Sequence, residues 1–291
     1  MTTPMIVRAA RAGVLLLALG ASLLPTGPAS LAAQPVLLPD LGMHASLEIV
    51  LDTYVREGLV YYRALRSERG RLDRYISGLD LPPAALEGWS RDQRAAYWLN
   101  AYNALVLRTV INAYPITGRA GEYPSDSIQH VAGAFTAKRH RVAGRNVSLE
   151  QIEKEMLPTF DDPRMYFALG RGSVGGGRLR SEVFTADRLD SQLTTVAAEC
   201  VTRNECFRYD PAADRIEVSP IFGWRTDAFT KAYPGDTTVF AGRSPIELAI
   251  LHLVLPHVLP SERRGLRANT FTLAYAPYDW RLNDLTGGGP R

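Results

Sequence analysis

The segment from Ala95 to Ile111 constrains the fold most, because it is apolar on almost every side. Ser90 is a natural N-cap and Gln93 stands three residues later, the capping-box arrangement that begins a helix. Pro115 prevents the helix from continuing past Tyr114. A helix without a polar face has to be enclosed by other elements. The sequence therefore predicts a long central helix in the core, with the rest of the domain packed around it.

The other hydrophobic patterns predict more helices than strands, and the two do not alternate regularly. Capping residues and apolar stripes predict further helices at 47–60, 67–77, 148–157, 187–200, 221–232 and 244–255. Turn residues between short apolar runs predict hairpins with arms at 139–142 and 146–148 and at 207–209 and 216–218, and a further strand at 270–276. The expected fold is α+β: a helix-rich single domain with a buried central helix and a small, mainly antiparallel sheet.

The N-terminal residues predict a secretory signal peptide over 1–33. Arg8 and Arg11 precede the apolar run from Ala12 to Leu24, and Ser30-Leu31-Ala32 offers the small-x-small pattern of a cleavage site. The alternative is a membrane anchor, but this run falls short of the ~20 residues needed to span a bilayer. We therefore expect an exported protein, periplasmic or extracellular, with a linker at 34–44, one domain at 45–284, a disordered tail at 285–291 and no transmembrane segment after cleavage.

The charge balance argues against a nucleic-acid partner. The chain has 33 Lys and Arg against 30 Asp and Glu, and removing Arg8 and Arg11 with the signal leaves 31 against 30. A nucleic-acid surface ordinarily needs a clear excess of positive charge. Its two cysteines, Cys200 and Cys206, are expected to form a short-range disulfide after export, the alternative being a pair of unlinked thiols.

A glycine-rich segment at 170–177 follows a short apolar run, Met165 to Leu169, which we interpret as a buried strand. Gly170 to Gly175 fits G-x-G-x-x-G, but a dinucleotide site needs a helix opening directly off the glycines, and here the next helix is delayed. We expect no cofactor, and we expect no metal because the ligand spacing of zinc sites is absent. No G-x-S-x-G motif marks a serine hydrolase. The backbone N–H groups of the loop, with Arg171, Arg178 and Arg180, would suit an anion. The alternative is a flexible loop with solvated arginines.

Two asparagines, Asn100 and Asn103, lie three residues apart on the predicted central helix. Buried amides require hydrogen-bond partners, so each is expected either to tether loop backbone or to line a site.

A set of short motifs resembles the domain of unknown function 547 family. It comprises Ala96-Tyr97-Trp98-Leu99-Asn100-Ala101-Tyr102-Asn103-Ala104-Leu105, Tyr114-Pro115-Ile116, Leu149-Glu150-Gln151-Ile152-Glu153, Asp162-Pro163-Arg164, Phe167-Ala168-Leu169, Ser173-Val174, Leu179-Arg180-Ser181-Glu182 and Tyr278-Asp279-Trp280. The resemblance extends from about Leu47 to Asn283.

The resemblance implies that the family carries two cysteines and two histidines in this region, a constellation similar to that of cysteine hydrolases. In this chain the cysteine positions hold Arg171 and Gly176, and the histidine positions hold Tyr166 and Lys154. Neither Arg nor Lys supplies a low-pKa nucleophile or a near-neutral base at pH 7. The expected binding cleft, more cationic than that of the family, comprises Lys154, Tyr166, Gly170, Arg171, Gly172, Ser173, Arg178, Arg180, Glu182, Asn100 and Asn103.

We therefore expect a non-catalytic domain, a degenerate enzyme that binds an anionic small molecule, peptide or protein partner. One alternative is an active hydrolase that uses Ser173 with Glu153, Glu182 or His252. Another is a purely structural envelope protein. The sequence does not identify the ligand or the biological process.

Overall fold

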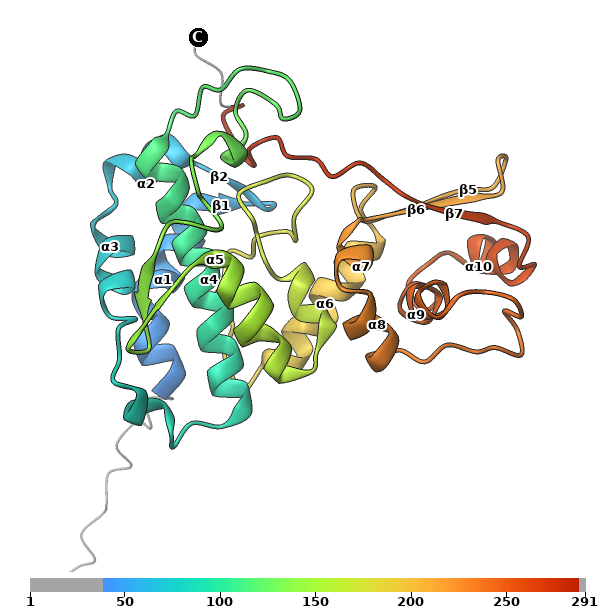
Figure 1. Ribbon diagram of the computed structural model, residues 1–291, viewed down its shortest axis with the longest axis horizontal. Coiled ribbons are helices and arrows are strands. Elements are labelled where there is room, and N and C mark those ends of the chain that lie inside the picture. The colour runs from blue at the N-terminus through green and yellow to red at the C-terminus, as the bar shows by residue number, and fades with distance from the viewer. Residues whose placement is uncertain (1–38, 288–291) are drawn as a thin grey trace, which may run out of the picture. The chain divides into compact units, whose positions relative to one another are not determined.

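The computed structural model describes residues 39–287, and the central helix is its main structural feature (Figure 1). Helix α4 spans Arg91–Ala113, and Ser90 and Gln93 form the predicted capping box. Nearly every residue from Ala95 to Ile111 is buried. The prediction of an enclosed core helix is therefore confirmed.

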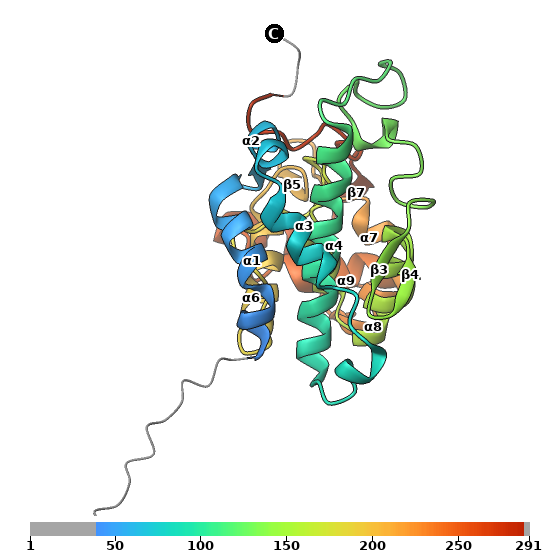
Figure 2. The same cartoon turned by 90° about the vertical axis from the view of Figure 1, so that its left-hand side faces the viewer.

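The first helices pack along one side of α4 (Figure 2). They are α1 (Pro39–Tyr54), α2 (Tyr62–Ser67) and α3 (Gly70–Ser77), followed by the 3-10 turn η1 (Pro83–Leu86). Helix α1 begins at Pro39, a residue favoured in the first helical turn, so part of the predicted linker is helical. The predicted 47–60 helix was too long: it stops at Tyr54, and strands β1 (Val55–Arg56) and β2 (Leu59–Val60) form a hairpin instead. Its turn residues, Glu57 and Gly58, have φ of 54° and 82°, which end a helix.

The middle of the chain contains a predicted hairpin and then a series of tight helical turns. Strands β3 (His140–Val142) and β4 (Arg145–Val147) pair antiparallel. The 3-10 turn η2 (Ile128–His130) precedes them, and α5 (Leu149–Gln151), the π-helical turn η3 (Ile152–Met156) and the 3-10 turns η4 (Leu157–Phe160) and η5 (Pro163–Phe167) follow.

The predicted strand at Met165 to Leu169 is wrong, because η5 covers Met165 to Phe167 and the last two residues are not extended into a strand. Asp162 accepts a hydrogen bond from the backbone N–H of Arg164, and Pro163 holds the first position of the turn. A side-chain cap followed by proline favours a helical turn over an extended strand.

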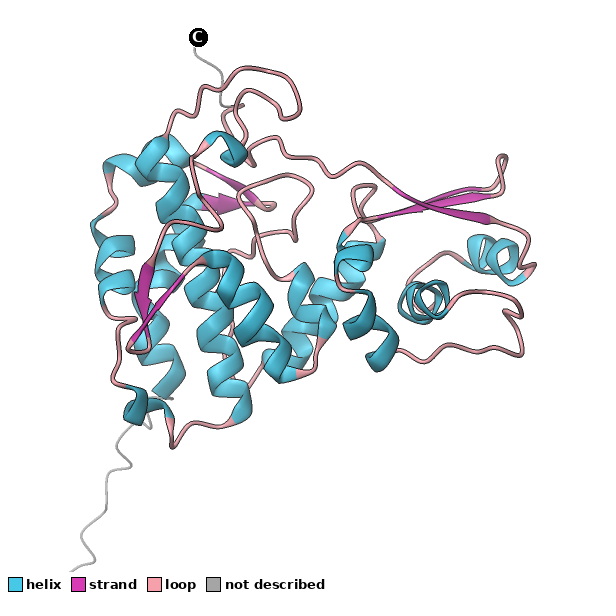
Figure 3. Ribbon diagram, in the orientation of Figure 1, coloured by secondary structure: helices cyan, strands magenta, loops and turns pink. Residues whose placement is uncertain are grey.

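The last part of the chain adds helices and the only three-stranded sheet of the described residues (Figure 3). Its elements are α6 (Leu189–Val201), β5 (Phe207–Asp210), β6 (Arg215–Val218), α7 (Ile221–Trp224), α8 (Thr226–Ala232), α9 (Pro245–Val254), α10 (Pro260–Arg267) and β7 (Thr272–Tyr275). Strand β6 pairs antiparallel with β5 and parallel with β7. The predicted 221–232 helix is interrupted at Arg225, whose φ of −130° is not helical.

The segment after β7 returns to the N-terminal helices. Val60 donates its N–H to the carbonyl of Asn283 and accepts from the N–H of Leu285. The side chain of Asn283 accepts a hydrogen bond from Tyr62, and that of Asp284 accepts one from Tyr114. Leu285, which we predicted to lie in a disordered tail, is therefore hydrogen-bonded to β2.

These elements share one hydrophobic core. The predicted helix-rich α+β single domain is confirmed, with three small and mostly antiparallel sheets in the described part. Between residues 39 and 287, no helix is both long and apolar enough to cross a membrane. The predicted signal peptide lies outside the described residues.

Candidate functional site

The two asparagines of α4 hold two loops against the core. Asn103 donates from Nδ2 to the carbonyl of Ala168 (3.0 Å) and accepts from the N–H of Gly170 (2.9 Å). Asn100 bonds both backbone groups of Phe184 in the same way, at 2.8 and 2.9 Å. Of the two predicted roles, the structure supports loop tethering. The start of the glycine-rich segment is therefore fixed in place.

Arg171 enters the core because the backbone turns sharply at this point. Arg171 and Gly172 have φ of 34° and 63°, in the left-handed region. A Cβ atom on Gly172 would lie 3.2–3.3 Å from Ile128, Val110 and Val106, so a larger residue has little room. The side chain of Arg171 is only 3% exposed. The predicted solvated arginine is therefore buried at this position.

A single carboxylate accompanies two guanidinium groups beside this turn. Glu153 Oε1 accepts from Arg171 Nη2 (2.6 Å) and from Arg225 Nη2 (2.7 Å). Its other oxygen accepts from the hydroxyl of Tyr102 at 3.3 Å, and Arg171 Nη1 donates to the carbonyl of Tyr166 at 3.1 Å. We call Glu153, Arg171 and Arg225 the arginine–glutamate cluster. Two positive charges against one negative charge leave it with a net positive charge.

The electrostatics of this cluster favour the ionised forms of Glu153 and Arg171. Burial alone would raise the pKa of Glu153, but Arg171 and then Arg225 outweigh it and hold this pKa below its ordinary value. Burial would also lower the pKa of Arg171, yet the nearby Glu153 charge raises it overall. Removing the charge of Glu153 would leave two arginines without compensation in a poorly solvated place.

The π-helical turn η3 places Glu153 in this position. It covers Ile152–Met156, directly after the capping box formed by Ser148 and Gln151. Glu153 is buried while Lys154 and Glu155 point to solvent. Single π turns inside helices occur frequently at functional sites.

A cleft of about 570 Å³ opens beside the cluster. Arg225 forms part of its wall, with its Cζ 4.9 Å from the ring centroid of Tyr166. Trp224 is 43% exposed and lies 5.8 Å from Arg171 Cζ. The lining residues of this Trp224 cleft are Leu157, Pro158, Asp161, Asp162, Pro163, Tyr166, Gly223, Trp224, Arg225, Thr226, Asp227, Ala228, Lys231 and Ala232. The cleft combines aromatic surface with the accessible edge of a charged cluster.

Comparison with known families now identifies the chain. Residues 86–201 match the model of the family described as a protein of unknown function, DUF547. Residues 86–201 belong to the DUF547 family. The matched residues include Glu153 and Arg171, whereas Trp224 and Arg225 lie beyond them. Neither the curated proteins nor the solved structures contain a significant match to this chain.

The positions at which DUF547 proteins were expected to carry cysteine and histidine lie only partly together. Tyr166 and Arg171 are in contact, and Tyr166 also lines the Trp224 cleft. Lys154 points away from them, is exposed, and forms an ion pair with Glu150 at 2.5 Å. Lys154 therefore contributes no charge to the cleft that we predicted from the DUF547 resemblance.

The other predicted cations of the glycine-rich segment are paired with carboxylates. Arg178 contacts Glu57. Arg180 bridges Glu182 (2.8 Å) and Glu199 (3.0 Å). The expected cationic loop is therefore neutralised at these positions, and the unbalanced positive charge belongs to the arginine–glutamate cluster instead.

The residues of the alternative hydrolase have other partners. Ser173 Oγ hydrogen-bonds the hydroxyl of Tyr278 at 2.9 Å. His252 is exposed and bonds the carbonyl of Pro234 at 3.3 Å. Within residues 39–287, no hydrogen bond joins Ser173 to His252, Glu153 or Glu182, and no group of three His, Cys, Asp or Glu side chains is arranged to hold a metal ion.

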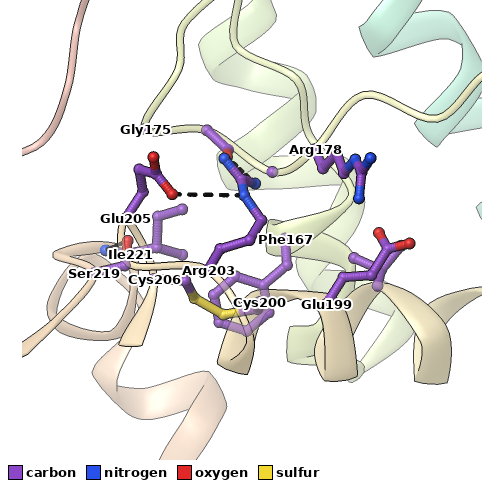
Figure 4. A pocket seen from close by; sticks show the side chains of 13 residues that line it. Phe167, Gly175, Arg178, Glu199, Cys200, Arg203, Glu205, Cys206, Ser219 and Ile221 are labelled. Atoms are coloured by element: carbon purple, nitrogen blue, oxygen red, sulfur yellow. Dashed lines mark hydrogen bonds and ion pairs between the residues drawn. A yellow bond between two sulfur atoms is a disulfide. The ribbon is translucent and has the colours of Figure 1, made fainter. Parts of the chain in front are cut away.

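The predicted disulfide joins Cys200 and Cys206 at the end of α6 (Figure 4). Arg203, within the closed loop, donates to the carbonyls of Val174 (3.0 Å) and Gly176 (3.3 Å). The adjoining space has a volume of only about 10 Å³, which is too small for a ligand. The disulfide loop therefore supports the glycine-rich segment without forming a binding site.

The sequence analysis missed Trp224 and Arg225, although both line the cleft. These two residues lie where the predicted 221–232 helix is interrupted. A large aromatic residue next to a cationic one at such an interruption is a pattern that could have indicated the cleft. Glu153 was considered only as a residue of the alternative hydrolase, and its two arginine partners are 18 and 72 residues away.

Proposed function

We propose that this DUF547 protein is an exported, non-catalytic binding protein whose ligand is a small anionic molecule held in the Trp224 cleft. The observation that carries the proposal is the sharing of one carboxylate by Arg171 and Arg225. Arginine donates fork-shaped pairs of hydrogen bonds that match carboxylate and phosphate groups. A ligand anion would supply the second negative charge that the cluster lacks.

Arg225 is the side chain through which this anion would bind. Its side chain is 18% exposed and forms part of the cleft wall, whereas Arg171 is almost entirely enclosed. Its Nε–H is buried and has no hydrogen-bond partner among the described residues. An unpaired donor of this kind gains a charge-assisted hydrogen bond when an anion enters.

The shape and lining of the cleft favour a small molecule with an aromatic or apolar part. Its volume of about 570 Å³ lies in the range of small-molecule sites, roughly 300–1,000 Å³. Trp224 presents exposed ring surface beside Arg225, whose guanidinium lies over the ring of the buried Tyr166. Two carboxylates at the margin are already paired, Asp161 with Lys231 and Asp162 with Arg164. The expected ligand therefore carries one anionic group next to a planar or apolar body.

The chemistry of the lining supports binding without turnover. Arg171 stands where the resemblance places the DUF547 cysteine, and its charge is tied to Glu153. The cysteines of residues 39–287 are both in the disulfide. The cleft lining itself includes no thiol and no imidazole. A base near neutral pH and a low-pKa nucleophile are the groups that hydrolysis by this family scaffold would need.

Titration calorimetry with 1-naphthalenesulfonate, an anionic aromatic probe, tests the proposal on the purified chain. We expect binding, and weaker binding of 1-naphthylmethylammonium, which has the same ring and the opposite charge. Arg225→Gln should weaken sulfonate binding by roughly 10- to 150-fold, since a hydrogen bond to a charged group contributes about 1.5–3 kcal/mol. Trp224→Ala should weaken binding of both probes.

The matched control is Arg208→Gln. Arg208 and Arg215 also share one carboxylate, Glu217, but they do so on the exposed face of a strand pair. This variant should bind the sulfonate as the native chain does. Equal binding of both probes, or unchanged binding by Arg225→Gln, would refute the proposed anion site. Hydrolase assays with a Ser173→Ala control test the other half, because turnover that is lost in this variant would make the chain an enzyme.

A further inference from the structure

A second concavity is lined by residues of α9, of α10 and of the loop that precedes α9. It has a volume of about 310 Å³. We call it the α9–α10 groove, and its lining residues are Asp236, Phe240, Leu248, Leu251, His252, Leu255, Pro256, Arg263 and Arg267. None of them lines the Trp224 cleft.

The floor of the groove is apolar. Leu248, Leu251 and Leu255 lie on successive turns of one face of α9 and its end, and Phe240 from the preceding loop adds an aromatic ring. Leu255 is only half-buried. Leu248, Leu251 and Phe240 are buried beside it. The exposed part of Leu255 next to this apolar cluster favours a ligand with a hydrocarbon part.

One wall of the groove is cationic and incompletely paired. Arg263 donates from Nη2 to the carbonyl of Pro256 at 3.3 Å, and its buried Nε–H has no partner among the described residues. Arg267 is exposed and forms no ion pair within residues 39–287. The acidic residue of α10, Glu262, instead accepts from the backbone N–H of Leu259 at the start of the helix.

The carboxylate of Asp236 offsets only one of these two positive charges, through its electrostatic interaction with Arg267. Its Oδ1 accepts from the N–H and hydroxyl of Thr238 and from the N–H of Val239, which holds the carboxylate in its own turn. Two arginines therefore face one carboxylate that already has other partners. The groove has a positive wall above a hydrocarbon floor.

We propose that the α9–α10 groove binds a single acyl chain that bears one anionic head group, with the chain on the leucine floor and the head group on Arg263 and Arg267. Charge complementarity selects this class over a neutral or cationic amphiphile. Arginine suits the head group because its planar fork matches a carboxylate. This site is independent of the ligand proposed for the Trp224 cleft.

Titration calorimetry with decanoate below its micellar concentration tests the proposal. We expect binding that tightens about three- to fourfold per added methylene from octanoate to dodecanoate, as burial of hydrocarbon requires. Decyltrimethylammonium and decyl maltoside, which have the same tail and other head groups, should bind at least tenfold more weakly. Equal binding of the three decyl probes, or no binding of decanoate, would overturn the proposal.

The double variant Arg263→Gln with Arg267→Gln tests whether decanoate binds in this groove. We expect at least a tenfold loss of decanoate affinity, with an unchanged melting temperature showing that the domain still folds. Arg264→Gln is the matched control, because Arg264 is an exposed arginine of the same helix and does not line the groove. Decanoate binding that survives the double substitution belongs to another site and contradicts the proposal. Binding to anionic vesicles without binding to monomeric decanoate would also contradict it.

Discussion

Replacing Glu153 by Gln tests the arginine–glutamate cluster directly, because it removes one charge and keeps the shape. The side chain of Glu153 is 12% exposed, that of Arg171 3% and that of Arg225 18%. Breaking a buried ion pair by removing one partner costs about 3–5 kcal/mol, since the remaining charge stays uncompensated. For a domain of this size, that loss lowers the melting temperature by roughly 6–20 °C.

Urea unfolding of the native chain and of Glu153→Gln at pH 7 measures this loss. Glu155→Gln is the control, because Glu155 lies on the same π turn but is exposed and makes only one side-chain hydrogen bond, to Gln151. The control should stay within about 0.5 kcal/mol of the native chain. A Glu153→Gln variant as stable as this control would refute the argument that the carboxylate of Glu153 compensates the charges of both arginines.

The pH dependence of this difference has a definite sign. Burial opposes ionisation of Glu153, but the two arginines dominate, so its pKa in the folded chain lies below the ordinary value of 4.5. The stabilisation is therefore complete above about pH 4.5 and is lost as the pH falls through the lower folded pKa. The difference between the native chain and Glu153→Gln should shrink on acidification below that value.

Two further predictions concern other buried polar groups. Asn103→Ala leaves two loop backbone groups unpaired, and each should lower the free energy of unfolding in urea by about 1–3 kcal/mol. The control is Asn112→Ala, an exposed change on the same helix, which should change this free energy little. Burial lowers the pKa of His44 to about 4 from 6.5, so the unfolded chain takes up a proton before the folded chain does. The contribution of His44 should lower the free energy of unfolding by up to ~1.4 kcal/mol per pH unit as the pH falls from 6.5 to 4. A His44→Gln variant whose stability has the same pH slope as the native chain would contradict a lowered pKa at His44.

Local signals in the sequence were sufficient for the central helix and the hairpins. The capping box at Ser90 and the stop at Pro115 act within a few residues, and so do the turns between the hairpin arms. The apolar run from Met165 to Leu169 was wrongly predicted as a strand, because a short buried strand and a short buried helical turn have the same apolar composition. The decisive signal was the preceding Asp162-Pro163 pair, which begins a helical turn.

The candidate site was less predictable because its charges come from distant parts of the chain. The pairing of Tyr166 and Arg171 followed from the DUF547 resemblance, and the structure brings them into contact. The sequence does not show which carboxylate faces which cation, so Lys154 and Arg178 appeared to be free when each has a partner. Arg225 belongs to the cluster through its tertiary contact with Glu153. Neither the position of Arg225 in the sequence nor its neighbouring residues indicated this contact.

The pairing of residues 283–285 with Val60 affects the order of folding. The bond from Tyr62 to Asn283 spans 221 positions, and that from Tyr114 to Asp284 spans 170. Contacts of such separation slow folding, since a long stretch of polypeptide must be immobilised before they form. A nascent chain emerging from the ribosome cannot complete its hydrophobic interior until residue 285 has been released. Residues 283–285 therefore complete the packing around Val60, Tyr62 and Tyr114 only after the rest of the domain has been made.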